Sequence, residues 1–280
     1  MKIVVTGAAG YIGRHVVTEC LNLGHTVYVS DFSFKGIDER AFRIDTPIFS
    51  GSTSIYYELH EPDVLIHLAW RDGFIHNSKA HMDDLSKHVI FLNQLVDSGL
   101  PYLSVMGSMH EIGYWEGVVN ADTPCNPLSM YGIAKNALRQ EIMLYTQDKD
   151  TDVHWLRGFY IYGDDAHGSS IFSKLYQANE NGKKTFPFSS GTNLYDFISV
   201  SEIAKMIAVA STQSTYNGII NVCSGNPVSL ADMVERYIRE KSLHIQLEYG
   251  AFPDRPYDSP GIWGDASIIR AIMEKHSACN

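Results

Sequence analysis

A glycine-rich loop directly follows an apolar segment at the start of the chain. Residues 2–6 (KIVVT) predict a buried strand, and residues 11–23 have the apolar spacing of a helix. A glycine turn between a strand and a helix lets the backbone approach a pyrophosphate, which the helix N-terminus favours through its free N–H groups and dipole. An ordinary strand-to-helix turn is the alternative. The residues predicted to bind this group are Gly7, Gly10, Tyr11, Ile12 and Gly13.

Strand and helix patterns alternate along the first half of the chain. The predicted strands are residues 26–30, 63–69, 101–106 and 153–161, and the predicted helices are 81–98 and 129–145. Such alternation implies right-handed βαβ units. We therefore expect an α/β fold of the Rossmann type, a doubly wound parallel sheet covered by helices on both faces.

The pattern becomes less regular after residue 163, where Gly, Ser, Asn and Pro are frequent. We expect residues 1–163 to form a dinucleotide-binding domain and residues 164–280 to form mainly a smaller α/β substrate lobe, with some later segments returning to the first domain. A ligand would lie between the two, outside the carboxyl ends of the strands.

Composition excludes several other classes of protein. The chain has 280 residues, of which 45% are hydrophobic and 19% charged, so it is neither disordered nor a coiled coil. Its net charge of −10 argues against nucleic-acid binding. It has no apolar run long enough to span a membrane, and its start leaves no room for a signal peptide. The four scattered cysteines form no CxxC pair, so we expect reduced thiols, a cytoplasmic location and no metal site.

Asp31 closes the predicted strand at residues 26–30, about 20 residues after the glycine loop, where an acidic side chain binds the ribose hydroxyls of NAD. A carboxylate at this position repels the 2′-phosphate of NADP, so we expect NAD as the cofactor. Lys35 lies close enough to leave NADP possible, and a turn-capping Asp31 is the alternative.

Tyr131 and Lys135 are four residues apart on a predicted helix and therefore share one face. A phenol is a poor acid or base at neutral pH, and a neighbouring ammonium lowers its pKa. The pair can then move a proton to or from a sugar hydroxyl. Ser108, after the predicted strand at 101–106, could bond the same oxygen or cap a turn. A surface helix pair is the alternative for Tyr131 and Lys135.

Several ordered motifs resemble those of the extended short-chain dehydrogenase/reductases, in the family of nucleotide-sugar epimerases, dehydratases and reductases. The resemblance covers nearly the whole chain. Its motifs are TGAAGYIG (6–13), HLAW (67–70), GSMHEIG (107–113), NPLSMYGIAK (126–135), LRGFYIYG (156–163), DFISVSEIA (196–204), INVCSG (220–225) and RPYDSP (255–260).

This resemblance implies roles for individual residues. Ser108, Tyr131 and Lys135 would be catalytic, and Lys135 would also bind the nicotinamide ribose. The cofactor would be lined by His67, Leu68 and Ala69. The substrate would be a nucleoside-diphosphate sugar, with its contacts drawn from Ser108, Met109, His110, Tyr160 and Arg255. A solvated loop charge is the alternative for Arg255.

The chain departs from the family pattern next to the catalytic serine. Dehydratases of the family carry an Asp–Glu pair there, and this chain has Met109 and His110. Met cannot transfer a proton, so dehydration is disfavoured. Glu111 follows one position later, where we expect its side chain to point elsewhere. His110 is either a proton donor or a structural histidine.

The motifs around residues 107–117 and 126–135 resemble most those of family members that interconvert a nucleotide-linked 4-keto-6-deoxyhexose and its 4-hydroxy sugar. We therefore expect hydride transfer at C4 with Tyr131 as the acid/base. A 4-epimerase with the same residues is the alternative, and a non-catalytic NAD(P) sensor is a further one. The resemblance also implies a homodimer, built on helix faces that expose Ile90, Leu138, Ile142 or Tyr145.

Overall fold

A seven-stranded parallel sheet forms the centre of the molecule in this computed structural model, which describes residues 1–163, 170–253 and 259–279. The strand order is β11-β7-β5-β4-β1-β2-β3, and every neighbouring pair is parallel. The strands are β1 (Lys2–Thr6), β2 (Thr26–Ser30), β3 (Phe42–Arg43), β4 (Val64–His67), β5 (Tyr102–Ser108), β7 (Asp152–Gly158) and β11 (Gly218–Val222). The order reverses between β1 and β4, and this switch point opens at the carboxyl ends of the strands.

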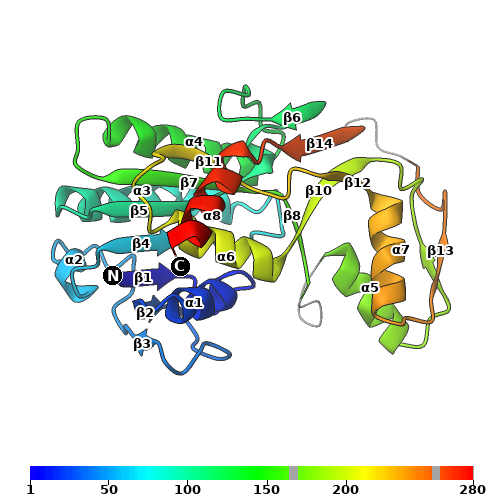
Figure 1. Ribbon diagram of the computed structural model, residues 1–280, viewed down its shortest axis with the longest axis horizontal. Coiled ribbons are helices and arrows are strands. Elements are labelled where there is room, and N and C mark those ends of the chain that lie inside the picture. The colour runs from blue at the N-terminus through cyan, green and yellow to red at the C-terminus, as the bar shows by residue number, and fades with distance from the viewer. Residues whose placement is uncertain (164–169, 254–258, 280) are drawn as a thin grey trace.

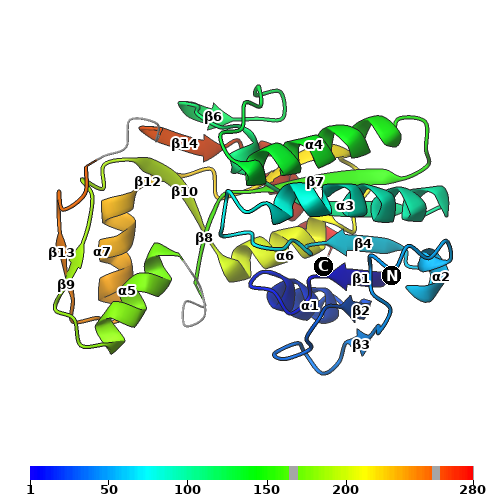
Figure 2. The same cartoon turned by 180° about the vertical axis from the view of Figure 1, so that it is seen from behind.

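Helices cover both faces of this sheet (Figures 1 and 2). One face carries α1 (Gly13–Asn22), α6 (Val200–Ala210) and α8 (Ser267–Cys279), and the other carries α2 (Ile55–Glu58), α3 (Ala80–Asp97) and α4 (Met130–Tyr145). Since α6, β11 and α8 lie after residue 164, later parts of the chain complete the central sheet and its covering. The fold class expected from the sequence is confirmed.

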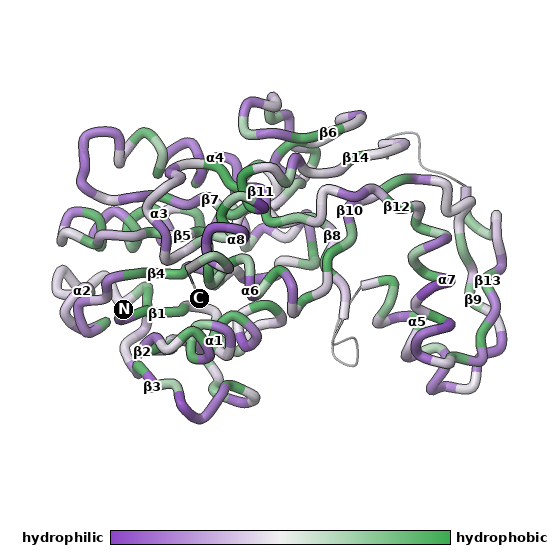
Figure 3. Tube along the Cα trace, viewed as in Figure 1, coloured by the Kyte–Doolittle hydropathy of each residue, from purple (hydrophilic) through white to green (hydrophobic). Residues whose placement is uncertain are grey.

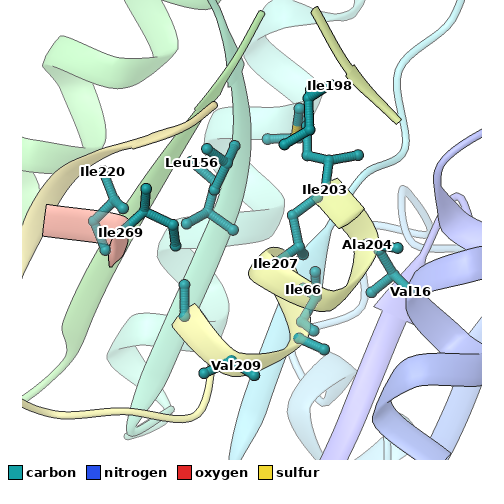
Figure 4. Close-up of a cluster of buried hydrophobic side chains, with 14 of the residues drawn as sticks. Val16, Ile66, Leu156, Ile198, Ile203, Ala204, Ile207, Val209, Ile220 and Ile269 are labelled. Atoms are coloured by element: carbon teal, nitrogen blue, oxygen red, sulfur yellow. The ribbon is translucent and has the colours of Figure 1, made fainter. Parts of the chain in front are cut away.

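Apolar side chains fill the space between the sheet and the helices on each face. The strands β1 and β4 are hydrophobic along their length (Figure 3), as expected for parallel strands that are buried on both faces. In Figure 4, α6 lays Ile203 and Ile207 against Leu156 of β7 and Ile66 of β4. This packing fixes the relative positions of the strand ends that carry the candidate site.

A second, mixed sheet leads away from the central one. Its main path is β12-β10-β14-β6, and β8 pairs with β10. These strands are β6 (Gly117–Val119), β8 (Tyr160–Tyr162), β10 (Leu194–Ser199), β12 (Pro227–Ser229) and β14 (Gly261–Gly264). Beyond it lies a small lobe with a separate, aromatic-rich core (right in Figure 1), formed by α5 (Ile171–Glu180), α7 (Leu230–Glu240), β9 (Thr185–Pro187) and β13 (Gln246–Glu248).

The single strand predicted over residues 153–161 is wrong. The structure ends β7 at Gly158, leaves Phe159 outside any strand and begins β8 at Tyr160. The two strands belong to different sheets, because β7 pairs with β5 and β11 whereas β8 pairs with β10. The strand pattern of the sequence therefore does not reveal the point at which the chain passes from the central sheet towards the small lobe.

The prediction of which residues lie on the outer faces of α3 and α4 is only partly correct. Ile90 is 54% exposed, but Leu138 and Ile142 are completely buried, because they face the core cluster between α3, α4 and the sheet. Tyr145 is half-buried and donates a hydrogen bond to Asp97 at 2.7 Å. The exposed apolar residues of α4 are Met130, Ile133 and Leu144.

Two features bear on membranes and metals. None of the helices in the described ranges combines the length and the apolar character that crossing a membrane requires. Nor do three or more His, Cys, Asp or Glu side chains gather into a potential metal site among the residues described.

Candidate active site

Ser108 lies at the carboxyl end of β5, next to the switch point. Its backbone is extended, and its hydroxyl accepts a hydrogen bond at 3.2 Å from the backbone N–H of His110, so it caps the short 3-10 helix η1 (Met109–Glu111). The Ser108 side chain also lies close enough to the Tyr131 phenol to act on its pKa, which it lowers. The capping role of Ser108 is therefore present in the structure, and its role as a partner of the phenol oxygen stays a prediction.

Tyr131 lies in the first turn of α4, against the loop after β4. Ser129 caps α4 by accepting a hydrogen bond from Gly132, and the Tyr131 backbone N–H donates to the His76 carbonyl at 2.9 Å. A side chain at position 132 would have its Cβ 2.3 Å from the His110 carbonyl oxygen. This glycine lets α4 approach η1 closely, which brings the phenol to Ser108.

The expected lowering of the Tyr131 pKa is wrong for this structure. Burial raises the pKa of Tyr131 to about 12, the hydrogen bond from Ser108 opposes the rise, and the Glu111 charge adds to it. The Lys135 ammonium lies 6.0 Å from the centre of the phenol ring. Desolvation outweighs the neighbouring cation here, so the phenol is protonated at neutral pH.

Lys135 lies one turn further along α4 and is buried. Its Nζ donates to the Met106 carbonyl at 2.7 Å and lies 3.8 Å from the ring centre of Trp70. Burial lowers the pKa of Lys135 to about 7, and the negative charge of Glu111 opposes part of this change. The amine therefore gains and loses a proton close to neutral pH.

Two histidines flank the phenol. The His76 ring stacks on the Tyr131 ring at 5.5 Å, and the His110 ring lies 4.3 Å from His76 and edge-on to Tyr131 at 6.0 Å. Burial lowers the pKa of both histidines, that of His110 to about 4, so both are neutral at pH 7. A neutral imidazole keeps one donor and one acceptor nitrogen. Neither ring hydrogen-bonds to another residue that the structure describes.

The glycine loop lies on the other side of the switch point. Gly7 has a φ of +68°, and a Cβ there would be 2.6 Å from the Ala69 nitrogen; a Cβ on Gly13 would be 2.1 Å from the Gly7 carbonyl oxygen. Both glycines are required for β1, α1 and the end of β4 to meet. Ile12 precedes α1 without a side-chain cap, and the first turn has no acidic residue, so this helix end suits an anion.

Two loop residues that were predicted to bind the cofactor have defined positions. Gly10 closes the turn, with its N–H donating to the Gly7 carbonyl at 3.1 Å. Tyr11 reaches across to the end of β8, where its hydroxyl donates to the Gly163 carbonyl at 2.6 Å. The loop is thereby tied to the strand that leads into the small lobe.

Asp31 follows β2 and holds the glycine loop directly. One carboxylate oxygen accepts the Ala9 N–H at 2.8 Å, and the other accepts the Phe32 N–H at 2.7 Å. The capping role is thus present in the structure, and ribose binding by the same carboxylate remains a prediction. Lys35, the residue that left NADP possible, is exposed.

The predicted cofactor lining after β4 needs a correction. The His67 ring is buried and bonds to the Thr6 hydroxyl and to His88, each at 2.8 Å, so it joins β1 to α3 inside the molecule and has no exposed surface to line a cofactor. Leu68 and Ala69 follow at the strand end and are half-buried. Any contact of this segment with a cofactor therefore falls to Leu68 and Ala69.

The residues predicted for the substrate are spread more widely. Met109 is largely buried in the core cluster of α1, α6 and α8, which leaves little of its side chain for a ligand. Tyr160 is half-buried in β8 and packs on Tyr195 at a ring distance of 4.3 Å, between the two sheets. Arg255 lies outside the described residues.

Sequence reasoning missed three residues of the site. Trp70 covers Lys135, donates to His81 at 3.0 Å and stacks on His88. His76 lies in the irregular loop 70–79, where no periodic pattern indicates a side-chain direction. Glu111 was expected to point elsewhere, and its side chain is completely buried, but its proximity to Lys135 was not foreseen. For these three residues, the one sequence feature that could have indicated a site residue was the position of Trp70 directly after a predicted strand.

Comparisons with known proteins agree with this geometry. Residues 3–223 match the NAD dependent epimerase/dehydratase family. The chain is 40% identical over 273 residues to a dTDP-6-deoxy-L-talose 4-dehydrogenase (NAD(+)) from Aggregatibacter actinomycetemcomitans, covering 94% of this chain and 99% of the relative. It is 22% identical to a probable UDP-glucuronate 4-epimerase from Rhizobium meliloti, covering 97% and 91%.

Solved structures show the same fold. The UDP-glucuronic acid 4-epimerase from Bacillus cereus, in complex with UDP-glucuronic acid and NAD, superposes with a TM-score of 0.80 at 22% identity and covers 98% of this chain and 93% of its own. A UDP-glucose 4-epimerase structure reaches a TM-score of 0.84 at 16% identity, covering 97% and 91%.

The chain belongs to the NAD-dependent epimerase/dehydratase family, a class of enzymes that share this fold. Within that family it is similar to the talose dehydrogenase along almost the full length of both chains. The family and the NAD cofactor predicted from the sequence are confirmed.

Proposed function

We propose that the chain is an NAD-dependent oxidoreductase that interconverts a nucleoside-diphospho-4-keto-6-deoxyhexose and its 4-hydroxy sugar. The observation that carries this proposal is the proximity of Ser108, Tyr131 and buried Lys135 to one another at the switch point that also holds the glycine loop. The 40% identical relative, a dTDP-6-deoxy-L-talose 4-dehydrogenase, supports this choice of sugar.

The residues present fit a dinucleotide. Gly7 and Gly13 let the loop pack closely between β1, α1 and the end of β4, the start of α1 is uncapped, and Asp31 stands at the end of β2 next to the loop. The loop would hold the pyrophosphate, and Asp31 the adenosine ribose. When bound, the nicotinamide supplies the hydride exchange at C4 of the sugar.

The protein's own groups handle the proton. Ser108 holds the sugar oxygen O4 by its hydroxyl, and Tyr131 transfers the proton to or from that oxygen. Because burial raises the pKa of Tyr131 to about 12, the phenol is the proton donor at neutral pH, which suits reduction of the 4-keto sugar. Lys135, with a pKa of about 7, can return a proton to the phenol.

His110 and His76 are the polar side chains that flank Tyr131. Their neutral rings offer hydrogen bonds to the sugar, and we place His110 in contact with substrate on this basis. Met109 occupies the place where dehydratases of the family carry an acid, so no group there removes water.

A nucleotide-sugar 4-epimerase is the second candidate, because several relatives at 22–24% identity over 92–98% of this chain are named as 4-epimerases. Such an enzyme uses the same three residues but must let the 4-keto intermediate turn over. A non-catalytic NAD(P) sensor is disfavoured because the Ser–Tyr–Lys set is intact.

A redox assay tests the proposal. The protein is mixed with dTDP-, UDP-, GDP- or CDP-linked 4-keto-6-deoxy sugars and NADH, and in parallel with the 4-hydroxy sugars and NAD, and absorbance of the reduced nicotinamide is followed. A reductase consumes NADH in proportion to product. A 4-epimerase converts 4-hydroxy sugars while NADH absorbance stays constant, and that result would replace the first candidate with the second.

We propose a homodimer formed through the outer faces of α3 and α4, where Ile90, Ile133 and Leu144 are exposed. Light scattering at micromolar concentration should report twice the 31.3 kDa mass of one chain; a particle of one chain's mass would rule the dimer out. The thiols of Cys20, Cys125 and Cys223 are free, which supports the cytoplasm as the proposed location.

A further inference from the structure

Glu111 is a completely buried carboxylate directly behind Ser108. One of its oxygens accepts the Ser108 backbone N–H at 2.6 Å, and both oxygens lie 3.0 Å from the indole nitrogen of Trp155, which donates to them. Ser108 belongs to β5 and Trp155 to the neighbouring strand β7. A single side chain therefore ties the end of the catalytic strand to the strand beside it.

Two positively charged side chains, one from a strand and one from a helix, lie next to the Glu111 carboxylate. Arg157 on β7 and Arg139 on α4 approach Glu111 Oε2 through their Nε atoms at 3.5 Å and 3.8 Å. Arg157 is itself completely buried, and within the described part of the chain its Nε and Nη2 make no hydrogen bond. Arg157 therefore depends on Glu111 for its compensating charge.

The backbone is shaped to admit this contact. A Cβ at position 107 would lie 2.2 Å from the indole nitrogen of Trp155 and 2.8 Å from Glu111 Oε1. Gly107, the residue before the catalytic serine, is thus the only residue type that leaves room for the pair. Its φ is not positive, so the reason for glycine here is space and not backbone conformation.

We propose that Glu111 is a positioning residue of the active site, whose buried carboxylate holds the backbone of Ser108 against β7 so that the Ser108 hydroxyl meets the phenol of Tyr131. This inference rests on the proposed function for its kinetic test. Glu111 touches no substrate; it acts through Ser108. Burial raises the pKa of Glu111, whereas Arg157, the Ser108 N–H, the Trp155 indole and Lys135 oppose that rise. In its carboxylate form Glu111 stabilises the ammonium form of Lys135.

The closing experiment compares Glu111→Gln with Glu111→Ala in the full chain. Gln keeps an oxygen for the Ser108 and Trp155 donors and removes the charge, whereas Ala removes both. We expect kcat to fall about tenfold in Glu111→Gln and about a hundredfold in Glu111→Ala, with KM for the nucleotide sugar and the Kd for NAD unchanged within about twofold. Glu274→Gln makes the same chemical change at an exposed position of α8 and should leave every value unchanged.

The pH profile separates this role from a merely structural one. The titratable and charged groups that face Glu111 are Arg157 on β7 and Arg139, Lys135 and Tyr131 on α4. Without the carboxylate, Lys135 loses its proton at lower pH, so the alkaline limb of the kcat profile should move to lower pH in Glu111→Gln. A kcat within twofold of wild type and an unmoved profile would overturn the proposal.

A second measurement does not need the substrate. Amide hydrogen exchange at Ser108, followed in the protein without added sugar, should be at least about tenfold faster in Glu111→Ala than in wild type and little changed in Glu111→Gln. Equal exchange in wild type and Glu111→Ala would refute the positioning role. A wild type that reduces no 4-keto sugar, with this exchange pattern intact, would refute only the proposed function. If Glu111→Ala does not fold, Trp155→Phe, which deletes the indole donor, replaces it in both assays with the same direction of effect.

Discussion

The glycine loop and the tyrosine helix, which lie on the two sides of the switch point, differ in how their side chains are used. In the glycine loop, side chains are absent where the backbone must pack closely: Gly7 and Gly13 leave room for backbone contacts, and the N-terminus of α1 has no side-chain cap. At the tyrosine side, side chains pack together: Lys135 is buried, and Tyr131 and Trp70 are half-buried next to it.

This difference separates binding from chemistry. Backbone N–H groups keep their charge distribution at any pH, so the loop suits an anion that must always be held. Buried phenol and amine groups change their proton affinity with their surroundings, so the tyrosine side suits a proton that must move. Substitutions on the two sides should therefore affect different constants.

The largest effect is expected for Tyr131→Phe, which removes only the hydroxyl. General acid–base transfer contributes roughly 10²–10⁴-fold, so kcat for 4-keto sugar reduction should fall by about that factor. The Kd for NAD, measured by calorimetry, should stay the same, because the loop and Asp31 carry that binding. Near wild-type turnover would mean that the proton comes from another group, with His110 next to the phenol as the first candidate.

Gly7→Ala should weaken NAD binding, the constant that Tyr131→Phe leaves unchanged. Its Cβ would press on the Ala69 nitrogen, and φ is positive, so the loop must shift away from β4. We expect the Kd for NAD to rise by about tenfold or more, equivalent to about 1.4 kcal/mol. Gly73→Ala is the matched control, because a Cβ there meets nothing within 4 Å and φ is not positive. An unchanged Kd in Gly7→Ala would show that the loop does not hold the cofactor.

Asp31→Ala tests the choice between cofactors with a smaller effect. The wild type should prefer NADH to NADPH, since a carboxylate repels the 2′-phosphate, and the substitution should narrow the ratio of kcat/KM values by about tenfold. Because Asp31 also accepts the Ala9 N–H, turnover with NADH should fall as well. Wild-type turnover that is equal or better with NADPH would contradict the assignment and point to Lys35.

The smallest effect concerns stability. The pKa of Lys135 is lowered to about 7 in the folded protein from 10.5, so between these values the unfolded chain binds more protons and stability rises with pH. Lys135→Met should therefore raise Tm by a few degrees below pH 7, roughly 2–4 °C for each kcal/mol, and the gain should shrink towards pH 10. A lower Tm in Lys135→Met at pH 6 would show that contacts of the ammonium outweigh its burial.

The fold could be predicted from the sequence because the order and pairing of the strands follow from the local strand and helix patterns. The apolar strands and periodic helices of the first half lie within a few residues of their expected bounds, and parallel pairing follows from their alternation. The break at Phe159 was not predicted, since strand-forming residues stand on both sides of it and only pairing with different sheets separates the two strands.

The site was predicted as far as spacing and motif resemblance allow. Tyr131 and Lys135 lie on one helix, and Ser108 ends a strand, so the three could be identified from positions in the chain. His76 and Trp70 come from an irregular loop, where nothing local determines direction. The sign of the Tyr131 pKa shift depends on burial by groups distant in sequence, so the charge of Lys135 alone predicted the wrong direction.

The late return of the chain to its first sheet has a consequence for synthesis. When only residues 1–163 have left the ribosome, α6, β11 and α8 are still missing, and the face of the sheet that carries Ile66 and Leu156 lacks most of its cover. The edge of β7 also lacks its partner β11. An open strand edge and a bare apolar face promote aggregation, so a nascent chain or a truncation ending at residue 163 should require a chaperone until the last helix emerges.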